Sequence, residues 1–502
     1  MTVALATWLT ITFAPAAAGD VTLTLRPGPE SIESYTGRVY LVASQGRREP
    51  RYGDWWFNPE PLFHVDVAHW TVGEPLVLTA DTRGYPIKRL GDLPAGDWSL
   101  QSVIRTSDRS AAALSGAGTV LSRPVRITGR PVAGVPDVDI VLDTVEPPRT
   151  VIPRGMGLEQ FDVPSELLSE HFGRPFLLRA VVQIPERADA AHPVPTLYVI
   201  GGFPGSLSSA VMIPWLFSSH SEANELAIVY LEAEYRGGHS AFVDSPAGGP
   251  WGTSLVTELI PTLEAAFPLD TRRDARFVTG HSSGGWSALW LALEHREIFG
   301  GTVSTAPDPV DFTRFQTVDI YASDANIYRS HDGQRAPLAR RGGETIAWAD
   351  DFIAMESAMG EGGQMRSFEW TFSPRGPDGL PVPLWNRDTG VIDPDVATHW
   401  RQFDIADRIT REWDALQPVL KDRVLVVMGT EDTFHLDGAA LALDAVLTTR
   451  GLPDIVELVP GDHSNILTLE MTKRIMQRAL SMARRASPPA SDESTTHTPS
   501  PS

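Results

Sequence analysis

The chain has 502 residues, too many for one hydrophobic core, so we expect two or more domains. Its 63 Asp and Glu residues against 42 Lys and Arg residues give a formal net charge of -21, which argues against nucleic acid or an anionic membrane as a partner. The sequence contains no cysteine, which excludes disulfides, thiolate metal sites and a cysteine nucleophile.

The N-terminal residues have the pattern of an export signal. An apolar run over residues 3–14 is too short to span a bilayer, and Ala16-Ala17-Ala18-Gly19 then offers small residues for a signal peptidase. We therefore expect a signal peptide over residues 1–18 and a secreted or periplasmic protein. No Lys or Arg precedes the run, so the alternative is an ordinary apolar strand in a cytoplasmic protein. No other segment is long and apolar enough to be transmembrane.

Residues 19–150 contain short alternating runs punctuated by proline and glycine. The predicted strands are at residues 21–25, 38–42, 62–67, 75–79, 98–104, 124–127 and 138–142. Regularly spaced short strands with turn signals are typical of an immunoglobulin-like β-sandwich, which we predict for this domain. Its aromatic residues supply either core packing or a face on which a carbohydrate stacks; the residues concerned are Trp55, Trp56, Phe57, Phe63 and Trp70.

Residues 151–486 predict a different kind of domain, which follows a proline-rich linker near residue 147. Fully apolar strands alternate with helices here, and this pattern indicates a parallel sheet covered on both faces. The predicted strands are at residues 176–184, 196–200, 227–231, 277–279, 302–305, 424–428 and 455–459, and the main helices at 253–267, 436–449 and 466–483. We expect Pro261 to kink the first helix. The Pro, Ser and Thr residues of 487–502 predict a disordered tail.

A candidate nucleophile, Ser282, lies in Gly280-His281-Ser282-Ser283-Gly284. A short apolar strand precedes this stretch and a mostly apolar helix follows it. Strand, sharp turn and buried helix are the context in which G-x-S-x-G forms a nucleophile elbow, which exposes the serine at the end of the sheet. Glycine is expected at positions 280 and 284 because a β-carbon there would meet the neighbouring strand or helix.

Two further residues at predicted strand ends supply what a serine nucleophile needs, an imidazole base and a carboxylate that orients it. Asp432 follows the strand at 424–428, and His463 follows the strand at 455–459. An open α/β sheet places its site at the carboxyl ends of its strands. The chain order Ser282, Asp432, His463 is that of the α/β-hydrolases, so we predict these three as the catalytic residues.

Other residues compete for two of these roles. Glu431 or Asp437 is the alternative acid, in which case Asp432 is a turn or helix-cap residue. His435 is the alternative base, but it lies only three residues from Asp432 on the same loop.

Donors for an oxyanion complete the predicted site. We expect one to be the backbone N–H of Ser283 and the other the N–H of Phe203, in the loop after the strand at 196–200. The remaining acidic and histidine residues do not fall at metal-ligand spacing, so we predict no metal and no cofactor; those considered are Asp324, His331, Asp350 and Asp351.

Two motifs resemble a known family. Glu258-Leu259-Ile260-Pro261 with Glu264, followed by Gly280-His281-Ser282-Ser283-Gly284-Gly285, resembles the esterase D-like group, which includes enterochelin esterases, feruloyl esterase modules and mycolyltransferases. The resemblance covers about residues 175–305 and 420–485. It implies an α/β-hydrolase fold with a Ser-His-Asp triad formed by Ser282, His463 and Asp432.

The chain departs from this group at two places. The usual His-Gly of the oxyanion loop is Gly201-Gly202 here, which leaves the second donor less well defined. The connection at about residues 306–422 is also much longer than usual and rich in aromatic residues. Long connections in compact domains tend to be lids or binding loops, so we expect this insert to cover the site.

These observations favour a serine hydrolase that cleaves a small-molecule or carbohydrate-linked carboxylic ester through an acyl-enzyme on Ser282. The alternatives are an acyltransferase or a serine peptidase of the same fold, or a non-catalytic carbohydrate-binding protein, because fold does not fix function.

Overall fold

A computed structural model describes residues 21–25, 33–46, 48–53, 56–106, 114–129, 138–147 and 152–485. The chain forms two compact units. Unit 1 comprises Met1–Thr150, Tyr235–Gly238 and Ala349–Arg366, and unit 2 comprises Val151–Glu234, His239–Trp348 and Ser367–Ser502. The predicted signal peptide at 1–18 and the predicted tail at 487–502 lie outside the described residues. One part of the predicted insert at 306–422, residues 349–366, belongs to unit 1.

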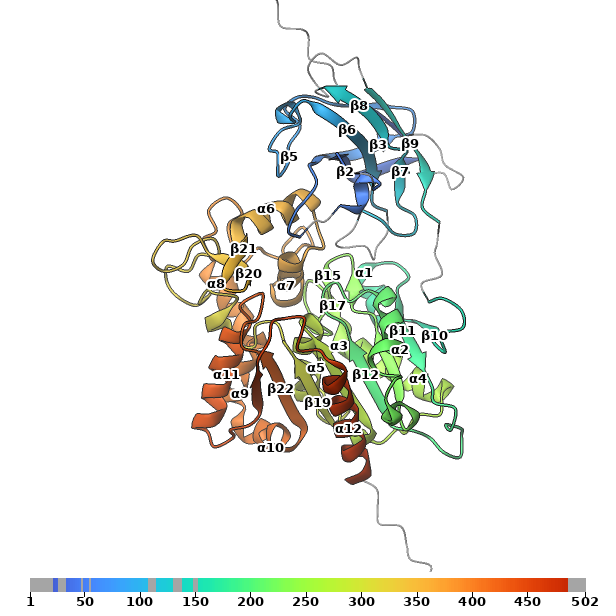
Figure 1. The fold of residues 1–502 in the computed structure, drawn as a ribbon, viewed down its shortest axis with the longest axis vertical. Helices are drawn as coiled ribbons and strands as arrows, with labels where there is room; N and C mark the ends of the chain where they lie inside the picture. The colour runs from blue at the N-terminus through green and yellow to red at the C-terminus, as the bar shows by residue number, and fades with distance from the viewer. Residues whose placement is uncertain are drawn as a thin grey trace, which may run out of the picture. The chain divides into compact units, whose positions relative to one another are not determined.

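The strands of unit 1 form one hydrogen-bonded sheet of nine strands (Figure 1). The order is β4-β1-β9-β7-β6-β2-β3-β5, and β8 pairs with β6. All pairs are antiparallel except β1 with β9. The bounds are β1 Val21–Leu25, β2 Ser34–Ser44, β3 Leu62–Thr71, β4 Pro75–Leu78, β5 Gly84–Tyr85, β6 Gly96–Ile104, β7 Val120–Ser122, β8 Val125–Gly129 and β9 Val138–Val145. The immunoglobulin-like topology stays a prediction.

Alternation along the strands builds the core of unit 1. In β9, Val138, Ile140 and Leu142 are buried and the residues between them are more exposed, as expected for a strand with one face on the core. Two of the aromatic residues considered above, Phe63 and Trp70, belong to this core. They therefore act in packing and not as an exposed stacking face.

Unit 1 also contains helix α6 (Ala349–Met359). Side chains of β2 and of the residue after β6 donate to the last carbonyl groups of this helix. Tyr40 donates to the Met359 carbonyl at 2.6 Å, Arg105 donates to the same oxygen at 2.9 Å, and Arg38 donates to the Ser357 carbonyl at 2.5 Å. These bonds satisfy carbonyls that have no partner within the helix, and the two guanidinium groups complement its negative C-terminal dipole.

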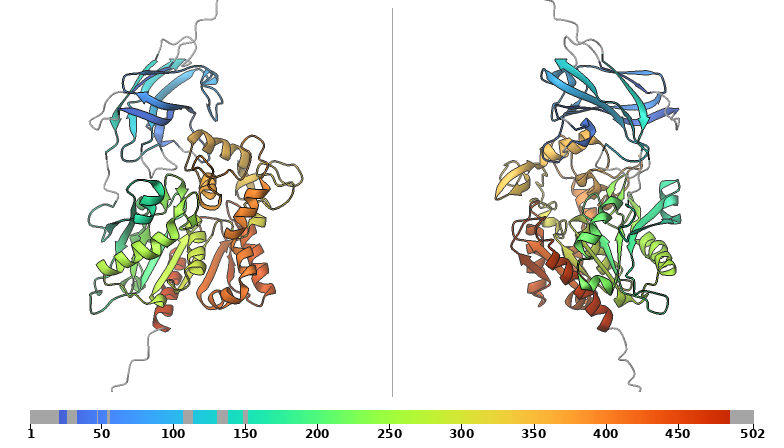
Figure 2. Two further views of the ribbon diagram at one scale, coloured as in Figure 1. Left: turned by 180° about the vertical axis from the view of Figure 1, so that it is seen from behind. Right: turned by 45° about the vertical axis from the view of Figure 1, so that its right-hand side comes forward.

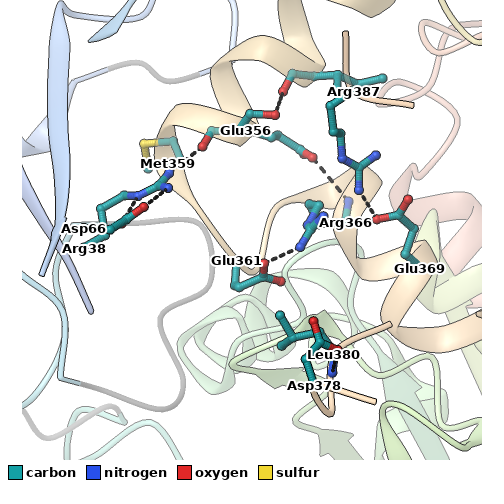
Figure 3. A network of polar contacts seen from close by, with 12 residues as sticks. Arg38, Asp66, Glu356, Met359, Glu361, Arg366, Glu369, Asp378, Leu380 and Arg387 are labelled. Atoms are coloured by element: carbon teal, nitrogen blue, oxygen red, sulfur yellow. Dashed lines mark hydrogen bonds and ion pairs between the residues drawn. The ribbon is translucent and has the colours of Figure 1, made fainter. Parts of the chain in front are cut away.

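The buried carboxyl group of Glu356 in α6 lies at the start of α7 (Gln364–Phe372), as Figure 3 shows. It accepts hydrogen bonds from the backbone N–H groups of Met365 at 3.1 Å and Arg366 at 3.3 Å. Burial outweighs these donors and raises the pKa of Glu356 to about 7.

The raised pKa of Glu356 predicts a pH-dependent stability. The folded state binds this proton more tightly than the unfolded state, so the stabilising contribution is complete below pH 4.5 and is lost as the pH rises through about 7. Glu356→Gln keeps an acceptor oxygen but does not titrate. Its Tm relative to wild type should therefore rise between about pH 5 and about pH 8, measured by circular dichroism. A difference in Tm that is constant with pH would contradict this assignment.

Unit 2 is built on a sheet of eight strands in the order β10-β11-β13-β12-β18-β19-β22-β23. The strands from β13 to β23 are parallel, and β10 and β11 are antiparallel to their neighbours. The predicted apolar strands are thus confirmed as a mostly parallel sheet, the arrangement of an α/β-hydrolase. The bounds are β10 Glu159–Pro164, β11 Leu177–Gln183, β12 Thr196–Ile200, β13 Ala227–Leu231, β18 Arg276–His281, β19 Gly301–Thr305, β22 Val424–Gly429 and β23 Val456–Val459.

Helices cover both faces of this sheet (Figures 1 and 2). One face, with Phe277 and Val303, packs against α12, and α5 contacts the same central strands from the other face. The remaining helices of unit 2 include α1 Glu166–Phe172, α2 Ile213–Leu216, α8 Pro394–Trp400, α9 Ile405–Arg411, α10 Trp413–Arg423 and α11 Asp437–Thr449, with α5 at Ser283–Glu294 and α12 at Leu469–Arg485. No helix in the described ranges combines the length and apolar character needed to cross a bilayer.

The helix predicted at 253–267 is divided into three parts. It begins as α3 (Trp251–Ser254), widens into a π-helical turn at Leu255–Leu259 and continues as α4 (Ile260–Ala266). Pro261 lies in the first turn of α4 and has no N–H to donate to the preceding turn. A wider turn before the proline is one way in which a helix accommodates it.

The backbone passes very closely where β18 turns into α5. A β-carbon on Gly284 would lie 2.1 Å from the Ile200 carbonyl oxygen and 2.5 Å from that of Gly201. A β-carbon on Gly280 would lie 2.1 Å from the Gly284 carbonyl oxygen. The two glycines are therefore required by contact between backbones, as the sequence predicts.

This contact makes a direct prediction about stability. Gly284→Ala should lower the free energy of unfolding by about 1–3 kcal/mol or prevent folding, because rigid backbone has to move. Gly438→Ala is the matched control, since a β-carbon at this helical glycine of α11 meets nothing within 4 Å. The control should match wild type or gain up to about 1 kcal/mol. Denaturant unfolding compares them, and equal stability of the two variants would contradict the steric argument.

Candidate active site

Ser282 has the backbone conformation of a strained turn. It lies between β18 and α5 with φ 59° and ψ -126°, a region that a residue with a side chain rarely adopts. Hydrogen bonds on both sides hold it there. Its N–H donates to the Thr305 carbonyl at 3.0 Å, and its carbonyl accepts from the N–H groups of Trp286 at 3.0 Å and Asp308 at 3.3 Å.

Asp432 and His463 are joined by a hydrogen bond. The Nδ1 of His463 lies 2.7 Å from Oδ2 of Asp432, whose side chain is fully buried. The other carboxylate oxygen accepts from the backbone N–H of Phe434 at 2.8 Å and of Leu436 at 3.3 Å. A carboxylate accepts only, so Nδ1 carries the proton. When His463 is neutral, its Nε2 is then a proton acceptor, the tautomer that a general base requires.

The elbow lies beside this pair. The ring of His281, the residue before Ser282, is 4.9 Å from the ring of His463, centroid to centroid. On a second side, Phe434 packs edge-on against His463, also at 4.9 Å. Within the described part of the chain, the Ser282 hydroxyl makes no hydrogen bond. A hydrogen bond from this hydroxyl to Nε2 of His463 is therefore a proposal.

His281 is buried next to the candidate base. Burial, with the nearby His463, lowers the pKa of His281 to about 3, so the ring is neutral near pH 7. Its Nδ1 lies 3.1 Å from Oγ1 of Thr305, the residue opposite it on β19. The structure thus gives His281 both a polar partner and contact with His463.

The alternative acid and base residues have other surroundings. Asp437 accepts a hydrogen bond from Arg340 at 2.8 Å, and Glu431 is exposed. The Nε2 of His435 is buried and has no hydrogen-bond partner among the described atoms. Among the residues described, only Asp432 of these acids is bonded to a histidine that contacts the elbow.

The loop expected to supply the second oxyanion donor lies against Ser282. A β-carbon on Gly202 would be 3.0 Å from Cβ and 3.6 Å from Oγ of Ser282. The peptide that precedes Phe203 therefore lies next to the candidate nucleophile. Ser283 is the first residue of α5, where the helix dipole favours negative charge.

Three residues with a strained backbone lie in these elements. Eight non-glycine residues in the described ranges have a positive φ. Ser282 is one, Ala306 follows the strand beside the elbow, and His435 belongs to the loop of Asp432. Such outliers cluster at functional sites, where the surrounding structure holds them.

Part of the aromatic insert forms a packed core over α5. Phe372 contacts Trp286 of α5 at 5.0 Å between centroids, and Trp400 contacts Phe372 at 5.2 Å. Phe312, Phe315, Phe368 and Phe403 extend the same cluster. For these residues the structure favours packing within unit 2 over an open aromatic wall for a substrate.

Sequence reasoning did not identify two buried polar residues near the elbow, Asp308 and His239. Asp308 follows β19 and His239 precedes a short irregular segment, and neither belongs to a motif. A signal was present for Asp308 only, because it comes shortly after a predicted strand end, as Asp432 does. No group of three His, Asp or Glu side chains suited to a metal ion occurs in the residues that the structure describes.

Comparison with known proteins identifies the family. The family model described as "Putative esterase" matches residues 176–464, which is more than half of the chain. No curated protein matches. The match begins just before β11 and ends just after His463, so it includes the elbow and all three predicted catalytic residues.

Solved structures with low sequence identity are also similar. FphF, a fluorophosphonate-binding serine hydrolase of Staphylococcus aureus, is 16% identical over 65% of this chain and 97% of that one, with a TM-score of 0.36. An S-formylglutathione hydrolase from Agrobacterium tumefaciens is 17% identical over 66% and 98%, with a TM-score of 0.38. A ferulic acid esterase is 14% identical over 65% and 98%, with a TM-score of 0.40. Because the family model covers more than half of the chain and includes the elbow, this chain belongs to the esterase family and is a carboxylic ester hydrolase.

Proposed function

We propose that the protein is a serine esterase that works through an acyl-enzyme on Ser282, with His463 as general base and Asp432 as the residue that orients it. The observation that carries the proposal is the hydrogen bond between His463 and the buried Asp432, at 2.7 Å, beside the strained elbow. Nucleophile, base and orienting carboxylate are the three parts that serine catalysis needs.

The reaction begins when His463 Nε2 removes the proton of the Ser282 hydroxyl and Oγ attacks the ester carbonyl carbon. The negative charge that develops on the carbonyl oxygen is stabilised by the backbone N–H groups of Ser283 and Phe203. Collapse of this intermediate breaks the bond to the alcohol, which leaves with the proton from His463. Water then attacks the acyl-enzyme as His463 takes one of its protons. The bond from the acyl carbon to Oγ breaks, the carboxylic acid leaves, and His463 returns the proton to Oγ of Ser282.

The buried neighbours of His463 suit this role. Neutral His281 places no positive charge against the imidazolium that forms when His463 takes the proton. Asp432 stabilises that imidazolium through the bond to Nδ1. The proposed substrate is a small-molecule or carbohydrate-linked ester, and the proposed location is outside the cytoplasm, on the basis of the predicted signal at 1–18.

Replacing the nucleophile tests the proposal. Ser282→Ala should lower kcat for p-nitrophenyl acetate by about a million-fold, because no other hydroxyl can form the acyl-enzyme. Ser221→Ala, at an exposed serine of unit 2, is the control and should leave the rate unchanged. Circular dichroism checks that both variants fold. Comparable turnover by Ser282→Ala and wild type would overturn the proposal.

Replacing the acid separates Asp432 from its competitor. Asp432→Asn should lower kcat by about 10⁴-fold, because an amide can donate to Nδ1 and favour the wrong tautomer of His463. Asp437→Asn removes only the negative charge that faces Arg340 and should retain nearly the wild-type kcat. Steady-state kinetics of the two variants decides between the two acids. A larger loss in Asp437→Asn would assign the role to Asp437.

A further inference from the structure

A buried histidine contacts the loop that carries the proposed Phe203 donor. His239 is 2% exposed, and its Nε2 lies 3.1 Å from the Gly201 carbonyl oxygen. The backbone N–H of Ala241 donates to Nδ1 at 3.0 Å, so Nδ1 has no proton and Nε2–H donates to Gly201. These two partners fix the neutral tautomer. Burial, which lowers the pKa of His239 to about 4, keeps that form at neutral pH.

The same ring also packs against the far end of this loop. A β-carbon on Gly205 would lie 2.8 Å from Cδ2 of His239, and Gly205 has φ +74°. The Gly205 carbonyl in turn accepts from the N–H of Ala233 at 2.9 Å. His239 therefore touches the loop at Gly201 and at Gly205, on either side of Phe203.

Asp308 holds the other proposed donor. Its Oδ2 accepts a hydrogen bond from the Ser283 hydroxyl at 2.5 Å, and its backbone N–H donates to the Ser282 carbonyl at 3.3 Å. That carbonyl and the Ser283 N–H belong to one peptide group, and in a trans peptide the C=O and N–H point in opposite directions. Because the Asp308 N–H binds the Ser282 carbonyl oxygen, the Ser283 N–H of the same peptide points away from Asp308. Asp308 is 5% exposed, so these bonds are not weakened by bulk water.

The two residues meet at one small cavity. His239, Ser283, Asp308 and Trp286 all contribute to its lining, and it has room of about 10 Å³, close to that of a single water. The Nε1 of buried Trp286 has no hydrogen-bond partner within the described part of the chain. One cavity is thus lined both by a residue that contacts the oxyanion loop, His239, and by residues of the elbow and the segment that holds it.

We propose that His239 and Asp308 are positioning residues, which hold the N–H groups of Phe203 and Ser283 at the separation that an oxyanion requires. This inference rests on the proposed function. It goes beyond it because neither residue touches the reacting atoms, and each acts through a peptide group. If the two residues were important only for structure, replacing them would lower the stability of the fold. If they position the donors, replacing them lowers transition-state stabilisation in protein that remains folded.

The first test removes each contact separately. His239→Phe keeps a ring and loses the donor, and Ser283→Ala loses the hydroxyl bond to Asp308 and keeps the backbone N–H. Each should lower kcat for p-nitrophenyl acetate by about 10- to 100-fold with little change in KM, because an oxyanion forms only in the transition state. The rate of labelling of Ser282 by a fluorophosphonate should fall in proportion. His239→Gln, which retains an N–H donor, should recover part of the loss.

A matched control and a double variant sharpen the result. His171→Phe removes another histidine contact to a backbone carbonyl, Nε2 to Ala247 at 3.2 Å, and should leave kcat unchanged. Asp308→Asn combined with Ser283→Ala should lower kcat little more than Ser283→Ala alone, because the two side chains act through one hydrogen bond. Circular dichroism and Tm identify the folded variants, and Ser283→Ala serves if His239→Phe does not fold.

The outcomes separate this inference from the proposed function. Wild-type protein that carries no label on Ser282 would overturn both. Wild-type protein that is labelled, with folded His239→Phe and Ser283→Ala variants whose kcat matches wild type, would overturn the positioning roles alone. Losses in kcat that the His171→Phe control shares would do the same, since they would reflect general destabilisation.

Discussion

The site depends on how closely three backbone segments approach one another. The carbonyl groups of Ile200 and Gly201 lie where a β-carbon on Gly284 would have to be. The Gly284 carbonyl group likewise lies where a β-carbon on Gly280 would have to be. Only glycine permits this contact, and it holds β12, β18 and α5 together at the carboxyl edge of the sheet. Ser282 is the single residue between β18 and α5. Its positive φ is the strain of this very short connection. Packing and not catalysis thus explains the shape of the elbow.

Burial sets the protonation states around this turn. The pKa values of His281 and His239 are lowered to about 3 and about 4, because both rings are removed from water and neither has a carboxylate partner. Among these three rings, only that of His463 is hydrogen-bonded to a carboxylate, that of Asp432. In the proposed mechanism this carboxylate stabilises the imidazolium of His463, whereas His281 and His239 are neutral near pH 7.

Much of the fold could be predicted from the sequence because the parallel strands are fully buried and hence continuously apolar. The strands at 196–200 and 227–231 were predicted with the bounds that the structure has. The joined pair Asp432 and His463 could be predicted because both follow such strands, whereas the catalytic roles remain a proposal. The contact of His239 with Gly201 could not be predicted, since it joins residues 38 apart without any motif. The placement of residues 349–366 in unit 1 was likewise not predictable, because no sequence motif marks its contacts, such as that of Tyr40 with the Met359 carbonyl.

The proposed catalysis requires that a hydroxyl, an imidazole and two backbone N–H groups converge on one reacting carbonyl. The most direct measurement is a crystal structure of the protein after reaction with a fluorophosphonate, whose phosphorus becomes tetrahedral, as an ester carbon does during attack. We expect phosphorus bonded to Oγ of Ser282, with its oxygen about 2.7–3.1 Å from the N–H groups of both Phe203 and Ser283. We also expect Nε2 of His463 within hydrogen-bond reach of Oγ. A label on another residue, or a phosphoryl oxygen directed away from both N–H groups, would contradict the proposed catalysis.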